Sequence, residues 1–153
     1  MTKKEQKLSV ELLNRLVANT SVLLMQTLHY HWNITGPEFN DYHKLLDDQY
    51  NMLFQDLDVV AERVRAVGGF ALGSMKEMIK HADLKEDTGA CPKPKQIITN
   101  LLKQYERHMS QIREGIILLE EETSDFGSKK MLEDFLEKYE KTAWMFRSLL
   151  GKQ

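Results

Sequence analysis

The chain has 153 residues, of which 42% are hydrophobic and 29% are charged, and its formal net charge at pH 7 is −2. This length and this apolar content fit one domain, residues 1–153, that can bury a substantial core. The small net charge excludes a general electrostatic signature of nucleic-acid or membrane binding.

Apolar residues recur at three- and four-residue steps in the first part of the chain, which predicts two amphipathic helices. The first helix spans about residues 6–34 and the second about residues 38–67. Gly36 and Pro37 mark a short turn between them, and Gly68 follows the second helix. We expect the second helix to turn one apolar stripe toward the core: Phe39, Tyr42, Leu46, Tyr50, Leu53, Leu57, Val60, Val64 and Val67.

The second half of the chain contains one short and two long predicted helices. Ser74 and Glu77 have the spacing of a capping box, which predicts a short helix over about residues 75–82. A third long helix begins near Lys95, and a fourth follows Ser128, which we expect to cap it. Four long helices with one apolar face each predict an all-α four-helix bundle, with the short helix between the second and third long helices.

The second helix also carries a polar face, which consists of His43, Asp47, Asp58 and Glu62. At about 100° per residue, these side chains lie within about 100° of one another and about 115° from the apolar stripe. A solvated surface face would explain them as well, because any surface helix has one. However, they form two pairs at four-residue spacing, which lets two side chains converge on one ion. Imidazole and carboxylate ligands suit iron(II), manganese or zinc.

One helix cannot close this site, because Asp47 and Asp58 lie about 16 Å apart along the axis and a metal–ligand bond is about 2 Å long. The residue numbers of His43 and Glu62 have the same sum, 105, as those of Asp47 and Asp58. Two antiparallel copies of the helix, related by a dyad at its middle, would bring both pairs together. Two-fold symmetry then builds two sites, each shared between subunits.

His31 lies at the end of the first helix, where a histidine is often only a core residue. The short turn nevertheless brings it beside His43 as a further ligand, with Trp32 near the same place. A di-iron site inside a bundle uses Glu-x-x-His, and no histidine here has a glutamate three residues before it. We therefore expect an apolar bundle interior and a metal site at an interface.

The segments HWNITGPEFNDYH and DVVAERV resemble the Dps family of ferritin-like mini-ferritins. The shared pattern comprises His31, Trp32, Gly36, Phe39, His43, Asp47, Asp58, Ala61, Glu62 and Arg63. The resemblance runs from the first helix to the end of the chain. It implies a hollow homododecamer with iron-oxidising centres at its two-fold interfaces. One subunit would supply His31, His43 and Asp47 to each centre, and its neighbour would supply Asp58 and Glu62.

The resemblance further implies a ferroxidase that oxidises iron(II), with hydrogen peroxide preferred to dioxygen, and stores ferric oxyhydroxide in the cavity. Such a protein protects the cell against oxidative damage. Asp58 and Glu62 would be the main iron ligands, and the other three would hold a weaker second position. Trp32 would quench stray one-electron oxidants. Zinc could occupy the same ligands, because carboxylate–imidazole sites discriminate poorly by affinity alone.

Two surface features leave alternatives open. Lys3, Lys4 and Lys7 stand near the start of the chain and could give weak, salt-sensitive DNA binding, so a DNA-compacting nucleoid protein with a minor iron role is the alternative. The family lines its three-fold pores with acidic residues near the junction of the third and fourth helices. The residues at this junction are Glu121, Glu122, Asp125, Lys129 and Lys130, and the two lysines stand where acids are expected.

The compartment can also be predicted. Cys91 is the only cysteine, so a disulfide within the chain is excluded and the thiol is expected to be free. The opening MTKKEQKLSV lacks the apolar run of a signal peptide, and no segment reads as the roughly 20 apolar residues that cross a bilayer. We expect a cytoplasmic protein without a membrane partner.

Overall fold

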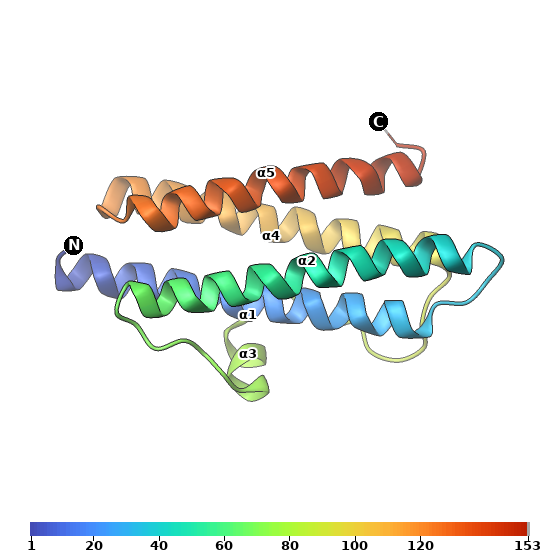
Figure 1. Ribbon diagram of the computed structural model, residues 1–153, viewed down its shortest axis with the longest axis horizontal. Helices are drawn as coiled ribbons and strands as arrows, with labels where there is room; N and C mark the ends of the chain where they lie inside the picture. Colours follow the sequence, from blue (N-terminus) through green and yellow to red (C-terminus); the bar gives the residue numbers. More distant parts are fainter. Residues whose placement is uncertain (153) are drawn as a thin grey trace.

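The computed structural model describes residues 1–152, and it contains four long helices and one short helix (Figure 1). They are α1 (Lys3–Asn33), α2 (Phe39–Ala66), α3 (Met75–His81), α4 (Pro94–Glu122) and α5 (Phe126–Leu149). The described residues include no strand. The predicted all-α bundle, with a short helix between the second and third long helices, is confirmed.

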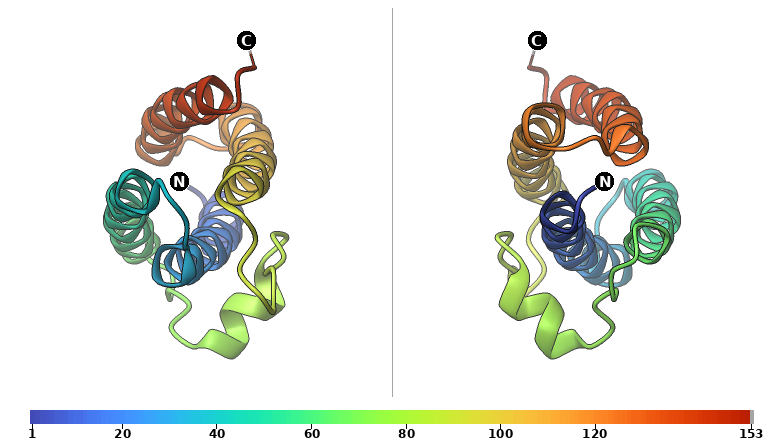
Figure 2. Two further views of the ribbon diagram at one scale, coloured as in Figure 1. Left: turned by 90° about the vertical axis from the view of Figure 1, so that its right-hand side faces the viewer. Right: turned by 90° about the vertical axis from the view of Figure 1, so that its left-hand side faces the viewer.

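The long helices form two antiparallel pairs, α1 with α2 and α4 with α5, which pack against each other. The end-on views of Figure 2 show the four axes surrounding a common interior, with α3 outside the bundle. α3 packs against α1, and the hydroxyl of Ser21 on α1 contacts the sulfur of Met78 on α3 at 3.4 Å. One flank of the α1–α2 pair is therefore covered in part by α3.

Side-chain caps define the starts of α3 and α5. The Ser74 hydroxyl accepts the Glu77 backbone N–H at 3.3 Å, so the predicted cap of α3 is confirmed. The prediction that Ser128 caps the last helix is wrong. Asp125 is the N-cap of α5, and its carboxylate accepts the Ser128 backbone N–H at 3.1 Å. Ser128 lies inside the first turn, where its hydroxyl donates to the same carboxylate at 2.7 Å.

Asp125 is also bound by Arg63 of α2, whose Nη2 lies 2.5 Å from the carboxylate. Burial alone would raise the pKa of Asp125, but the hydrogen bonds from Ser128 and Arg63 bring it below its usual value. Only 4% of Asp125 is exposed, so it is not available to line a pore, contrary to the sequence-based expectation. Glu121 and Glu122 are exposed and stay candidates.

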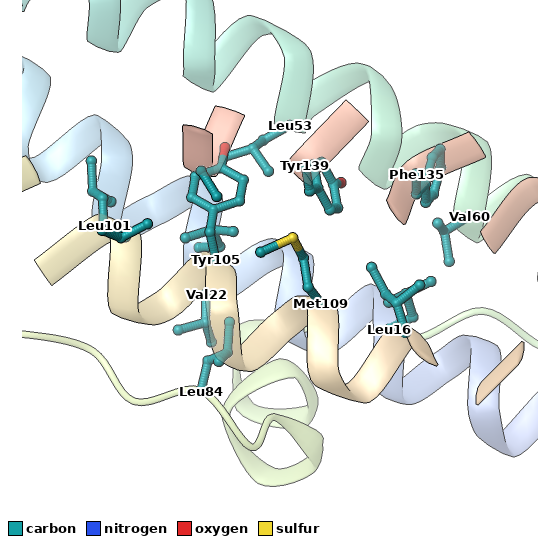
Figure 3. Close-up of a cluster of buried hydrophobic side chains, with 14 of the residues drawn as sticks. Leu16, Val22, Leu53, Val60, Leu84, Leu101, Tyr105, Met109, Phe135 and Tyr139 are labelled. Carbon is teal, nitrogen blue, oxygen red and sulfur yellow. The ribbon is translucent and has the colours of Figure 1, made fainter. Parts of the chain in front are cut away.

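The hydrophobic core lies between the two helix pairs and draws on all four long helices (Figure 3). Five members of the predicted stripe on α2 are buried in it: Leu46, Leu53, Val60, Val64 and Val67. Tyr42 and Leu57 are half-buried and pack against this core, as predicted, whereas the prediction is wrong for Phe39 and Tyr50, which lie outside it. The stripe is narrower than predicted because Gln49 and Asp56 of α2 also point into the bundle.

The expectation of an apolar interior is therefore also wrong. Buried Asp56 accepts a hydrogen bond from the Tyr139 hydroxyl at 2.7 Å and pairs with Lys138. The Tyr105 hydroxyl donates to the Gln49 side-chain oxygen at 2.9 Å. These polar groups satisfy one another, as buried polar groups must if they are not to destabilise the fold. The Asp56 charge is already balanced by a lysine inside the subunit.

The sequence-based expectation that no segment could cross a bilayer needs a correction for α1. Within residues 1–152, it is the one helix long and apolar enough to cross a membrane by length and composition alone. Half of its apolar window is buried among the other helices, which is the behaviour of a core helix. Its apolar residues are explained by packing within the bundle.

The burial of His108 predicts that the folded state loses stability in acid. The side chain of His108 is fully buried, and burial lowers its pKa from the usual 6.5 to about 4, although the nearby Gln111 side chain offsets part of the effect. Because the unfolded chain binds this proton more readily, the contribution is fully present above pH 6.5 and is lost as the pH falls toward 4. This contribution to the free energy of unfolding is about 3 kcal/mol.

We expect the drop in Tm between pH 7 and pH 4.5 to shrink in a His108→Gln variant, measured by circular dichroism. His81→Gln changes an exposed histidine and should keep the parental pH dependence. An equal drop in the His108→Gln variant and the parent would show that another group causes the acid sensitivity.

Candidate metal centre

The turn between α1 and α2 brings His31 and His43 face to face. Gly36, with a φ of +131°, takes a backbone conformation in this turn that other residues rarely adopt. The two imidazole rings stack with centroids 3.8 Å apart and planes 16° from parallel. The predicted approach of these two histidines is present within one subunit.

Two reciprocal hydrogen bonds hold the ring pair. Nδ1 of His31 lies 3.0 Å from the backbone oxygen of His43, and Nδ1 of His43 lies 3.0 Å from the backbone oxygen of His31. A carbonyl oxygen only accepts, so each Nδ1 carries the proton and donates it. Each Nε2 of the neutral rings is then an unprotonated lone pair, the form that binds a metal ion.

Neighbouring side chains of α2 support the pair. Phe39 stacks on His43 with centroids 4.8 Å apart, and Tyr50 meets the His31 ring edge-on at 5.1 Å. A hydrogen bond to Asp47, followed by desolvation and then by the negative charge of Asp47, raises the pKa of Tyr50. Phe39 and Tyr50 were assigned to the core from the sequence, although their four- and three-residue spacing from His43 and Asp47 places them beside these ligands.

The remaining candidates lie farther along α2. Asp58 and Glu62 are exposed, and among residues 1–152 neither makes a hydrogen bond or an ion pair. Asp47 is about 16 Å from Asp58 along the helix axis. Within the described part of the chain, no three His, Cys, Asp or Glu side chains form a group that could hold a metal ion. The candidate ligands of one subunit therefore fall into two separated groups.

Trp32 lies on a different side of α1 from His31, as expected for adjacent helical residues. Its side chain is 63% exposed and makes no hydrogen bond within the described residues. It lines a hollow of about 310 Å³ between α1 and the loop before α4. Glu86 and Asp87 stand on the loop side of this hollow.

Exposed apolar side chains accompany the unpaired carboxylates. Phe54 is 63% exposed and lies on the same side of α2 as Asp47 and Asp58, between them along the axis. Phe70, Met75 and Ile79 extend this apolar surface onto α3 and the segment before it; between 62% and 79% of each residue is exposed. Apolar groups of this size mark an interaction surface. The sequence analysis did not single out Phe54, which lies among the polar residues of this face.

Residues 10–153 match the family model of the ferritin-like domain. The chain is 33% identical over 143 residues to the DNA protection during starvation protein of Listeria innocua, which covers 93% of this chain and 91% of that protein. It superposes on the X-ray structure of Dps from Listeria monocytogenes with a TM-score of 0.90 and 31% identity, covering 94% of each chain. The chain belongs to the Dps family of ferritin-like proteins.

Other Dps proteins agree with this assignment. Dps from Vibrio cholerae, a member of a broad superfamily of ferritin-like diiron-carboxylate proteins, has a TM-score of 0.93 at 29% identity, with 98% and 93% of the two chains covered. Dps from Listeria innocua has been solved after soaking with cobalt and with zinc. An uncharacterised low-temperature-induced protein of Nostoc sp. is 33% identical over 153 residues, covering 100% of this chain and 86% of that protein.

The reciprocal hydrogen bonds predict the tautomers of the two stacked rings. Without metal, we expect the nitrogen-15 spectrum to show the Nδ1–H tautomer for the neutral rings of His31 and His43. Exposed His81 has no such acceptor and should sample both tautomers. An Nε2–H form at either stacked ring would contradict the hydrogen-bond assignment.

Proposed function

We propose that this Dps-family chain is a ferroxidase and iron-storage subunit that oxidises iron(II), preferably with hydrogen peroxide, and deposits ferric oxyhydroxide inside a homododecamer. Its role would be to protect a cell, from within the cytoplasm, against oxidative damage. One observation carries the proposal: an oriented His31–His43 pair and unpaired Asp58 and Glu62 lie on the same subunit, too far apart to share an ion.

A two-fold partner would complete each half-site. Pairing α2 antiparallel with its copy places His43 opposite Glu62 of the partner subunit and Asp47 opposite Asp58 of the partner subunit. Phe54 supports this arrangement, because the same pairing places it next to the dyad. There its exposed ring would find apolar cover, as the central residues of interfaces do.

The stacked rings favour a pair of metal positions. The lone pair of an imidazole lies in the ring plane, and two rings with centroids 3.8 Å apart and planes 16° from parallel do not point their lone pairs at one position about 2 Å away. His31 and His43 therefore serve two neighbouring ions. Their spacing resembles the 3.5–4 Å typical of two-metal sites. From the sequence, His31, His43 and Asp47 together were expected to hold the weaker second position; we now propose that His31 joins Asp58 and Glu62 of the partner subunit at the main position, and that His43 and Asp47 hold the second.

Two adjacent iron(II) ions suit peroxide as the oxidant. Each iron gives one electron, hydrogen peroxide takes both together with two protons, and two water molecules result. About one peroxide is then consumed per two irons, and no hydroxyl radical is released. The carboxylates of Asp47, Asp58 and Glu62 favour the reaction because they stabilise iron(III) more than iron(II). Trp32 would intercept stray one-electron oxidants.

DNA binding is the alternative role, since relatives are named DNA protection during starvation proteins. Lys3, Lys4 and Lys7 are exposed in the first turns of α1, and Lys7 pairs with Glu11 at 3.7 Å. Three lysines per subunit, repeated over a cage, would support weak contacts that disappear as the salt concentration rises. DNA binding would not explain the oriented His31–His43 pair or the unpaired Asp58 and Glu62.

The assignment of Glu62 predicts slow iron oxidation in a Glu62→Ala variant. Loss of a main ligand should reduce the rate of iron(II) oxidation by peroxide by roughly 10- to 100-fold, followed by the absorbance of iron(III). Glu114→Ala, which changes an exposed glutamate of α4, should leave the rate unchanged. An undiminished rate in Glu62→Ala would remove this residue from the site.

Sharing between subunits predicts complementation. An Asp47→Ala chain and an Asp58→Ala chain each lose every site alone, whereas a mixed two-fold pair restores one of its two sites, because one intact Asp47 meets one intact Asp58. Cobalt(II) bound per subunit, measured by titration of each variant and of the co-assembled mixture, checks this. No gain on mixing would mean that the ligands come from one chain.

A further inference from the structure

We infer that Phe70 of each subunit inserts into the hollow beside Trp32 of its two-fold partner. The inference rests on the proposed two-fold pair and adds a contact to it that involves none of the proposed metal ligands. The occupant of the hollow is thus a second copy of this chain.

Phe70 is held in position and presented outward. It is 79% exposed, the highest fraction among the large hydrophobic side chains described. Asn14 of α1 fixes the backbone on both sides, since its Nδ2 donates to the Phe70 carbonyl at 2.9 Å and its Oδ1 accepts the Leu72 N–H at 3.0 Å. The Arg65 guanidinium lies 5.9 Å from the centroid of the Phe70 ring. A rigid exposed aromatic ring beside a cation has the character of an interface anchor.

The hollow beside Trp32 has matching chemistry. Met25, His29 and Trp32 of α1 form one wall, and the loop carrying Glu86 and Asp87 forms the other. Its volume is about 310 Å³, whereas an apolar cavity of about 150 Å³ already holds benzene. Glu86 has no ion-pair partner among residues 1–152, so its carboxylate is available to a guanidinium that arrives with the phenyl ring. The hollow therefore suits both Phe70 and Arg65.

Phe70 and the hollow lie on the same side of α1. Asn14, which holds Phe70, is 18 residues from Trp32, and 18 residues make five full turns of an α-helix. Met25 deviates from the same direction by only about 20°. In the end-on views of Figure 2, α3 and the segment before it also lie outside the bundle. A partner subunit that packs against Phe70 on this side of α1 therefore also faces the hollow beside Trp32.

The axial positions agree as well. Within a subunit, α1 and α2 are antiparallel, with His31 beside His43 and the Gln6 Nε2 donating to the Val67 oxygen at 2.8 Å. In this register Asn14 is level with position 60 of α2. The dyad that pairs Asp47 with Asp58 places position 60 opposite position 45 of the partner. That position is level with His29 of the partner subunit, the middle of the hollow.

Insertion of Phe70 would have a consequence for the metal centre. Trp32 follows His31 directly, and the phenyl ring would remove its indole from water in the assembled protein. The same contact would cover the side of the proposed metal site that α3 does not cover. Both copies of the contact form at once, because the two-fold axis repeats them.

Disulfide trapping tests the contact. In a Cys91→Ser background, Phe70→Cys combined with Met25→Cys should give dimers on a non-reducing gel after mild oxidation, since a disulfide needs Cβ atoms about 4 Å apart. The two positions cannot join within one chain, because Asn14 and Met25 are about 16 Å apart along α1. Phe126→Cys with Met25→Cys, which uses an equally exposed aromatic position at the α4–α5 turn, should stay monomeric on the gel.

Fluorescence gives a second measurement without cysteines. In a Trp144→Phe background, Trp32 is the only tryptophan, and Phe70→Ala should shift its emission to longer wavelength and at least double its quenching by acrylamide. If Asp47→Ala and Asp58→Ala chains complement each other but neither the cross-link nor the shift is seen, the Phe70 contact is overturned and the proposed function stands. If complementation also fails, the two-fold pair itself is overturned, and the contact with it.

Discussion

The structure depends first on the reciprocal hydrogen bonds between His31 and His43. Each ring donates to the other residue's backbone carbonyl, so the end of α1 and the start of α2 are tied at two points. These bonds set the register of the antiparallel pair and the orientation of both rings. The same interaction thus ties the two helices together and leaves both Nε2 lone pairs free, as the proposed metal site requires.

Carboxylates that point into the bundle and carboxylates that point out of it differ in whether they have a partner within the subunit. Asp56 points inward and is neutralised by Lys138 and a hydrogen bond from Tyr139. Asp58, two residues later, points outward and has no partner among residues 1–152. A buried carboxylate without compensation would be strongly destabilising, whereas an exposed one stays hydrated until a partner arrives. The helix can therefore carry a buried, paired acid and an exposed, unpaired acid two residues apart.

The outward face of α1, α2 and α3 combines these unpaired acids with exposed Phe54 and Phe70. Apolar rings alone would drive association without a defined register, and carboxylates alone would repel one another. Together they favour a partner that covers the rings and brings cations or imidazoles to the acids. A second copy in antiparallel register would satisfy both demands, as the proposed function requires.

The sequence by itself determined the helices, the bundle and the spacing of the polar face, because hydrophobic periodicity and i, i+4 geometry are local properties of a helix. Only the tertiary structure decided that Asp125 rather than Ser128 caps α5, since that choice depends on Arg63 from a distant helix. It likewise decided that His108 is fully buried and that His31 and His43 are locked in one tautomer. Burial and hydrogen-bond partners arise between helices, and residue spacing within one helix carries no record of them.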